Sequence, residues 1–222
     1  MKNDKLMKLF LVFLVYFIYT MYASTLFGMF GISDNILASF IGDIIFSIFV
    51  IYTYRKNLKS DLKKIKKLSS KKLFLTILKW VALVFVFVMF CGFITEIIFP
   101  NQSIDANNDA IYNLYSISTW YTIFKTMIFG TIIEEILYRE SVRDNVKNKF
   151  MFIIISAVVY TFMNTIFVGF IEGSVVSALL MKFLPGIFWS IAYLKNNDNI
   201  LLLSMIKFTY NLIPLTILLL GL

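Results

Sequence analysis

The sequence predicts an all-α fold, a polytopic membrane helix bundle of about seven transmembrane helices with its N-terminus in the cytoplasm. Of the 222 residues, 59% are hydrophobic and only 15% are charged, and a soluble domain of this size could not hide so much apolar surface from water. Several apolar runs approach the roughly 20 residues that cross the hydrocarbon core of a bilayer. We therefore expect residues 1–222 to form a single integral membrane domain of a multi-pass cell-membrane protein.

The length of the apolar runs places the expected helices. The first run is too long for the apolar part of a signal peptide, so we expect it to remain as a membrane helix. A further short helix can lie in 100–112 or in 141–150. The seven expected helices cover residues 9–30, 36–54, 73–99, 113–138, 151–170, 175–194 and 200–220.

Charged residues alternate between the connecting segments. Residues 55–72 hold nine Lys or Arg and one acid, Asp61, and we expect them to form a cytoplasmic loop beside anionic lipid headgroups. The segments 31–35, 100–112 and 171–174 carry Asp or Glu but no Lys or Arg. This is the positive-inside pattern of a protein with its N-terminus inside and its C-terminus outside. The position between two apolar runs favours the lipid bilayer as partner and no nucleic acid.

The chain has one cysteine, Cys91, and no histidine. No disulfide can form within the chain, and zinc sites or serine dyads that use histidine are excluded. We expect no metal and no cofactor. An aspartyl-protease reading of Gly42-Asp43 fails because Phe40 occupies the position of the first glycine in that motif.

Six ionisable residues lie away from the ends of the expected helices, where charge is costly and marks function or pairing. For Asp43, Lys125 and Lys182 we expect ion pairs that pack helices together. The other three are Glu134, Glu135 and Lys207.

Glu134 and Glu135 are adjacent carboxylates near the end of a predicted helix. Glu135 and Arg139 are spaced i, i+4 with the acid first, which favours an intrahelical ion pair. Glu134 then has no local counter-ion and can face the bundle interior. A buried carboxylate of this kind can act as a general base near neutral pH.

The late helices carry Asn164 and the pair Lys207 and Asn211, which is again spaced i, i+4 and therefore shares one face. A single Asn in a membrane helix is most often a hydrogen-bonding contact between helices. A lysine one turn from an asparagine, in a chain with an unpaired glutamate, instead indicates a polar site.

These blocks resemble the CPBP family, the CAAX-protease and bacteriocin-processing proteins, also called Abi or type II CAAX prenyl endopeptidases. Glu134, Glu135, Tyr138 and Arg139 match the first block of that family residue for residue, and the resemblance covers a core of about 113–220. It implies an intramembrane glutamic endopeptidase that acts on a peptide or membrane protein at the cytoplasmic face.

The resemblance also implies roles for the site residues. Glu134 would activate water, Glu135 and Arg139 would pair, and Asn211 would donate to an oxyanion. Asn164 and Lys207 stand where the family has histidines. Asn164 cannot accept a proton, while Lys207 can stabilise an oxyanion or form an ion pair with Glu134.

Two functions of different classes therefore remain open. One is proteolysis by a site without histidine. The other is a non-proteolytic pseudoenzyme, a protease-like scaffold or a bacteriocin-immunity type of membrane protein that binds a partner. An ion pair between Lys207 and Glu134 would favour the scaffold. A small transporter is disfavoured because no matched pair of broken helices is present.

The expected topology can be tested by cysteine labelling of intact cells in a Cys91→Ala background. A cysteine at Asn107 should react with a membrane-impermeant maleimide, because 100–112 is expected outside. A cysteine at Lys64 should react only after the cells are opened. Labelling of Lys64→Cys in intact cells would reverse the orientation.

Overall fold

The computed structural model describes residues 2–31, 34–98, 114–166 and 182–220, without the side chains of residues 2–4, 23–24 and 165–166. Within these ranges the fold is helical. The three N-terminal helices are α1 (Lys2–Gly28), α2 (Asn35–Lys66) and α3 (Ser70–Ile98). The expected membrane helix bundle is confirmed to this extent, because four described helices are long and apolar enough to cross a membrane: α1, α2, α3 and α10 (Ile200–Leu220).

One continuous helical segment occupies the middle of the chain. It comprises α5 (Thr119–Ile123), η1 (Phe124–Ile133), η2 (Ile136–Glu140) and α6 (Ser141–Asn145). Helices α7 (Lys149–Ile166) and α9 (Leu184–Lys195) follow, and α10 ends the described chain. The additional short helix that the sequence allows within 141–150 is α6. The number of spans and the side of the membrane on which the N-terminus lies stay predictions.

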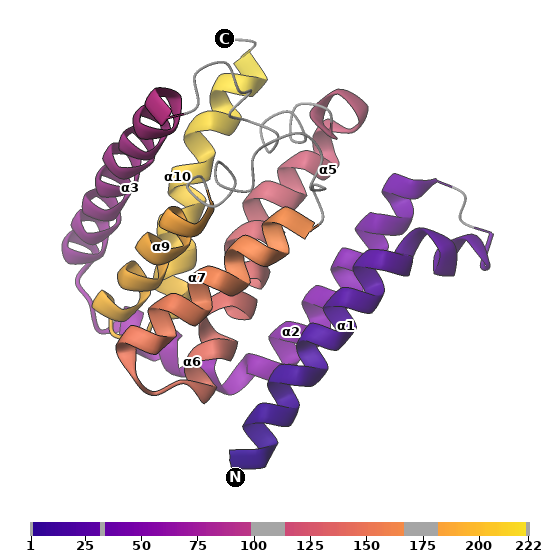
Figure 1. Cartoon of the computed structure of the whole chain (residues 1–222), viewed down its shortest axis with the longest axis horizontal. Helices are drawn as coiled ribbons and strands as arrows, with labels where there is room; N and C mark the ends of the chain where they lie inside the picture. The colour runs from indigo at the N-terminus through magenta and orange to yellow at the C-terminus, as the bar shows by residue number, and fades with distance from the viewer. Residues whose placement is uncertain (1, 32–33, 99–113, 167–181, 221–222) are drawn as a thin grey trace.

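The helices form a bundle in which α3, α9 and α10 lie on one side and the α1–α2 pair on the other (Figure 1). Helix α7 packs most extensively on α9, and α10 packs on both α3 and η1. The N-terminus, α6, the α2–α3 link and the α9–α10 turn all lie at one end of the bundle, and the C-terminus lies at the other (Figure 1). This arrangement places the central helical segment between the two sides.

The expected loop at 55–72 is wrong. Helix α2 continues to Lys66 and α3 begins at Ser70, so only residues 67–69 connect them. The extension continues the buried face of α2, since Tyr54, Leu58 and Ile65 contact the core. Lysines are good helix formers, and basic residues near a helix C-terminus interact favourably with the helix dipole. The basic residues therefore lie on helix turns rather than in a loop.

Asp61, the one acid in the basic segment 55–72, connects α2 to the N-terminus of α10. Its carboxylate accepts a hydrogen bond from the Ile200 backbone N–H at 2.7 Å and an ion-pair contact from Lys64 at 2.8 Å. Asn199 donates its side-chain amide to the Asp61 carbonyl oxygen. Asp61 thus supplies, from α2, the kind of acceptor that the N-terminus of α10 needs. This contact fixes the start of the helix that carries Lys207.

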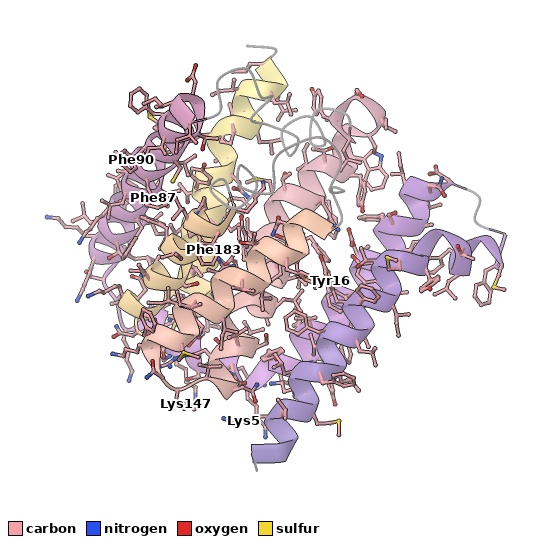
Figure 2. All side chains as sticks on the ribbon, in the orientation of Figure 1. Lys5, Tyr16, Phe87, Phe90, Lys147 and Phe183 are labelled. Carbon is pink, nitrogen blue, oxygen red and sulfur yellow. The ribbon has the colours of Figure 1, made fainter. Side chains whose placement is uncertain are left out.

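Two of the basic residues at one end of the bundle share an acidic partner. Asp144 of α6 lies 3.8 Å from the ammonium groups of both Lys5 and Lys8 on α1. Lys5 and Lys147 lie at this same end (Figure 2). The segments that the charge pattern assigned to one side of the membrane therefore share one end. Asp105, Asp109 and Glu172, which the charge pattern assigns to the opposite side, are outside the described residues, as is the start of the helix expected at 175–194.

Candidate functional site

The backbone around the paired glutamates is π-helical rather than α-helical. The Glu134 N–H donates to the carbonyl oxygen of Phe129, and the Ser141 N–H donates to that of Ile136, both five residues back. Such wide turns are rare and usually limited to a single turn, often at functional sites. They change the directions in which side chains leave the helix, so contacts expected from α-helical spacing must be verified in three dimensions.

Glu135 is the centre of a buried ion cluster. Its carboxylate lies 3.4 Å from Arg139 Nε and accepts a hydrogen bond of 2.6 Å from Lys207 Nζ. The side chains of Glu135 and Arg139 are fully buried, and only 9% of the Lys207 side chain is exposed. The contact between Glu135 and Arg139 that the sequence predicts is therefore confirmed.

Lys207 has a different main partner from the one expected. Its ammonium group is 3.8 Å from the Glu134 carboxylate, against 2.6 Å from Glu135. The expected Lys207–Glu134 pair exists, but it is the longer of two contacts. The intrahelical pair with Arg139 leaves one oxygen of Glu135 available, and Lys207 from α10 occupies it. Two acids and two cations thus form one neutral cluster.

Glu134 is the least enclosed member of this cluster. Of its side chain, 19% is exposed. The carboxylate turns back toward Gly130, where an added Cβ would stand 3.6 Å from Glu134 Oε2 and 3.1 Å from the Lys125 carbonyl oxygen. A Cβ at Gly130 would therefore be in ordinary contact with the Glu134 carboxylate, and its tight contact would be with the Lys125 carbonyl oxygen.

The two asparagines make backbone contacts. Asn211 donates its side-chain amide to the Thr126 carbonyl oxygen at 3.0 Å, which joins α10 to η1. Asn164 donates to the Tyr160 carbonyl oxygen of its own helix at 2.8 Å. The sequence predicts that four residues converge on one polar cavity: Glu134, Asn164, Lys207 and Asn211. The described contacts bring together two of them, Glu134 and Lys207. Asn211 lies one turn from Lys207 on α10, and Asn164 lies one turn beyond Tyr160 on α7.

Three tyrosines that the sequence analysis did not single out as candidate functional residues surround the cluster. The Tyr160 ring centre lies 4.8 Å from the Arg139 guanidinium carbon and 5.8 Å from Lys207 Nζ. The Tyr138 ring packs edge-on against Tyr160, with ring centres 5.5 Å apart. Tyr138 also shares a side-chain hydrogen bond with Tyr16, and both hydroxyls interact electrostatically with the Glu134 carboxylate.

Two of these tyrosines carry a sequence signal. Tyr138 and Tyr160 stand four residues from Glu134 and Asn164, so helical periodicity could have identified them. Tyr16 comes from α1, where it is buried on the side facing the bundle (Figure 2). Nothing in its local sequence connects it with a residue more than a hundred positions away.

A row of small residues positions Arg139 against α9. Arg139 Nη2 donates to the Gly186 carbonyl oxygen at 3.4 Å. The Ser190 hydroxyl, one turn later, lies 2.8 Å from the same oxygen and 3.0 Å from the Ser156 hydroxyl on α7. Gly186 allows close approach of the helices, because a Cβ there would stand 3.1 Å from both Ala157 Cα and Tyr160 Cδ1. The seam between α7 and α9 therefore holds two of the groups that contact Arg139.

A second buried ion pair has the packing geometry that the sequence predicts. Lys125 donates to both carboxylate oxygens of Asp43 at 2.9 Å. Tyr121 donates to the same carboxylate at 2.9 Å, and Tyr19 donates to it as well. The contacts join α1, α2, α5 and η1. Within the described part of the chain, no group of three or more Cys, Asp or Glu side chains is placed to hold a metal ion.

Comparison with known proteins agrees with the motif pattern. Residues 116–213 match the family model described as Type II CAAX prenyl endopeptidase Rce1-like. This segment is therefore similar to the type II CAAX prenyl endopeptidases of the CPBP family. No curated protein and no solved structure matches the chain. With its long apolar helices, the protein is a CAAX-protease-like intramembrane protein.

The matched segment contains the whole ion cluster. Glu134, Glu135, Arg139 and Lys207 all lie inside 116–213, as do both asparagines. Tyr16 and Asp43 lie outside it. The segment common to the family therefore carries the charged groups, and α1 and α2 add contacts from beyond it.

The Gly186 contact gives a stability test with an internal control. Gly186→Ala should lower the free energy of unfolding by about 1–3 kcal/mol, because the added methyl group forces α7 and α9 apart. Gly92→Ala on α3 meets no atom within 4 Å and should be neutral or stabilising by up to about 1 kcal/mol. Thermal unfolding of both variants in the same detergent measures the difference. Equal effects would contradict the close approach at Gly186.

Proposed function

We propose that this CAAX-protease-like protein binds a peptide or membrane-protein segment at the cytoplasmic membrane face without hydrolysing it. The observation that supports this proposal is the position of Lys207, 2.6 Å from Glu135 and 3.8 Å from Glu134. It makes the cluster neutral and ties the carboxylate with the expected catalytic role to a fixed cation. Such a site is suited to binding more than to proton transfer.

Water activation by Glu134 would have to disrupt this arrangement. Two opposite unit charges about 4 Å apart interact by about 4 kcal/mol at an effective dielectric constant of 20. A proton taken up by Glu134 would cancel its attraction to Lys207 and leave the buried cluster with excess positive charge. A general base contributes most when it exchanges its proton freely in the transition state. The ion pair opposes that exchange.

The residues at the two expected histidine positions do not supply the chemistry of histidine. Asn164 holds the position of the first, and an amide cannot accept a proton from water. Its amide group already donates to the Tyr160 carbonyl oxygen. Lys207 holds the position of the second and is engaged with both glutamates. Hydrolysis would therefore rest on Glu134 alone.

One observation favours proteolysis as a second candidate function. Glu134 is the most exposed member of the cluster, with 19% of its side chain exposed. Under this alternative Lys207 would stabilise the oxyanion of a tetrahedral intermediate, and Glu135 would hold Lys207 in place. The reaction would be an intramembrane glutamic endopeptidase reaction without histidine.

A cleavage assay separates the two functions. Purified protein in lipid nanodiscs is incubated with a library of fluorescence-quenched peptides, and the natural sequence is compared with Glu134→Gln. We expect no release of fluorescence above that of the variant, because the ion pair prevents water activation. A soluble protease added to a parallel sample verifies that the peptides are accessible. Cleavage by the natural sequence that Glu134→Gln abolishes, at unchanged thermal stability, would establish the endopeptidase instead.

A further inference from the structure

A cationic groove lies on the first turns of α3, on a helix outside the matched segment. It has a volume of about 350 Å³ and is lined by Ser69, Lys71, Lys72, Leu75, Thr76 and Lys79. Lys71 and Lys79 are spaced i, i+8, and Lys72 precedes Lys79 by seven positions, so all three lie on one face of the helix. At a rise of about 1.5 Å per residue, the backbone positions of the three lysines lie within about 12 Å of one another along the helix axis.

These three lysines have no acidic partner among the described ion pairs, which involve other cations. Lys64, at the end of the preceding helix, is by contrast paired with Asp61. Like charges one or two turns apart on a helix repel each other. An anion bound between them would relieve this repulsion.

Exposed apolar residues lie on the same turns of α3 as the groove, and one of them, Leu75, lines it. Phe74 and Leu78, on the same turns, are 65% and 53% exposed, and α3 is apolar from there to Ile98. Lys79 therefore stands inside a candidate membrane span. A lysine at such a position must extend its side chain toward the lipid headgroups. That direction leads back toward Lys71 and Lys72.

We propose that this groove binds the phosphate of an anionic membrane lipid. Lys71, Lys72 and Lys79 donate to the phosphate oxygens, and an acyl chain lies along Phe74 and Leu78. The exposed apolar side chains beside the lysines favour a lipid over free phosphate, because free phosphate has no acyl chain that could contact them. Ordinary surface attraction involves all basic residues alike, whereas a site of this kind depends on these three. The proposal is independent of the function proposed for Glu134.

Native mass spectrometry of protein released from nanodiscs tests the site. The nanodiscs contain equal amounts of phosphatidylglycerol and phosphatidylcholine, and retained lipid is counted. The groove variant K71Q/K72Q/K79Q is compared with the control K56Q/K59Q/K63Q, which removes the same charge from exposed positions at the end of α2. We expect the natural sequence and the control to retain phosphatidylglycerol, and the groove variant to lose it by about tenfold or more.

Two further samples complete the experiment. K71R/K72R/K79R keeps the charge and should retain the lipid, and Lys79→Gln alone should lower retention even if the triple variant does not fold. Equal losses in the groove variant and the control would overturn the proposal in favour of diffuse surface attraction. Full retention by Lys79→Gln would overturn it as well. Displacement of the lipid by millimolar inorganic phosphate would show that the site binds free phosphate instead.

Discussion

The ion pair between Lys207 and Glu135 determines how the rest of the site is arranged. Burying two charges has a large desolvation cost, which is recovered only when the charges meet with good geometry. Here Lys207 Nζ lies 2.6 Å from the carboxylate, and Arg139 approaches the other oxygen of Glu135. Removing any one of these groups would leave another charge buried without compensation. The helices that carry them, the η1–η2 segment and α10, are therefore held in one relative position.

The remaining helices attach to this centre through fewer polar contacts. Arg139 reaches α9 through the Gly186 carbonyl oxygen, and Tyr160 covers the cluster from α7. Asp61 fixes the start of α10 from α2. On the far side of the η1 segment, Asp43 and Lys125 join it to α2. A neutral, enclosed cluster with these contacts holds the helices in a fixed arrangement. A binding scaffold requires such an arrangement.

Much of this arrangement could be predicted from the sequence. Apolar run lengths located the helices, and the i, i+4 spacing of Glu135 and Arg139 predicted their contact, because both depend on local periodicity. The extent of α2 beyond Tyr54 could not be predicted from hydropathy, since its buried face continues beneath a surface of lysines. The choice of Lys207 between Glu134 and Glu135 also depends on how α10 packs against a π-helical segment. The contact of Tyr16 with Tyr138 is of the same kind, since only tertiary structure brings α1 to the site.

A double-mutant cycle on the free energy of unfolding tests most directly whether Lys207 is bound more strongly to Glu135 than to Glu134. The first cycle combines Lys207→Met with Glu135→Gln, and the second combines Lys207→Met with Glu134→Gln. Each substitution at Lys207 or Glu135 should cost about 3 kcal/mol or more, because it leaves a buried charge without its partner. The double variant should lose at least about 1 kcal/mol less than the sum of the two, and the coupling to Glu134 should be smaller. Additive losses within about 0.5 kcal/mol in the Glu135 cycle would contradict the account.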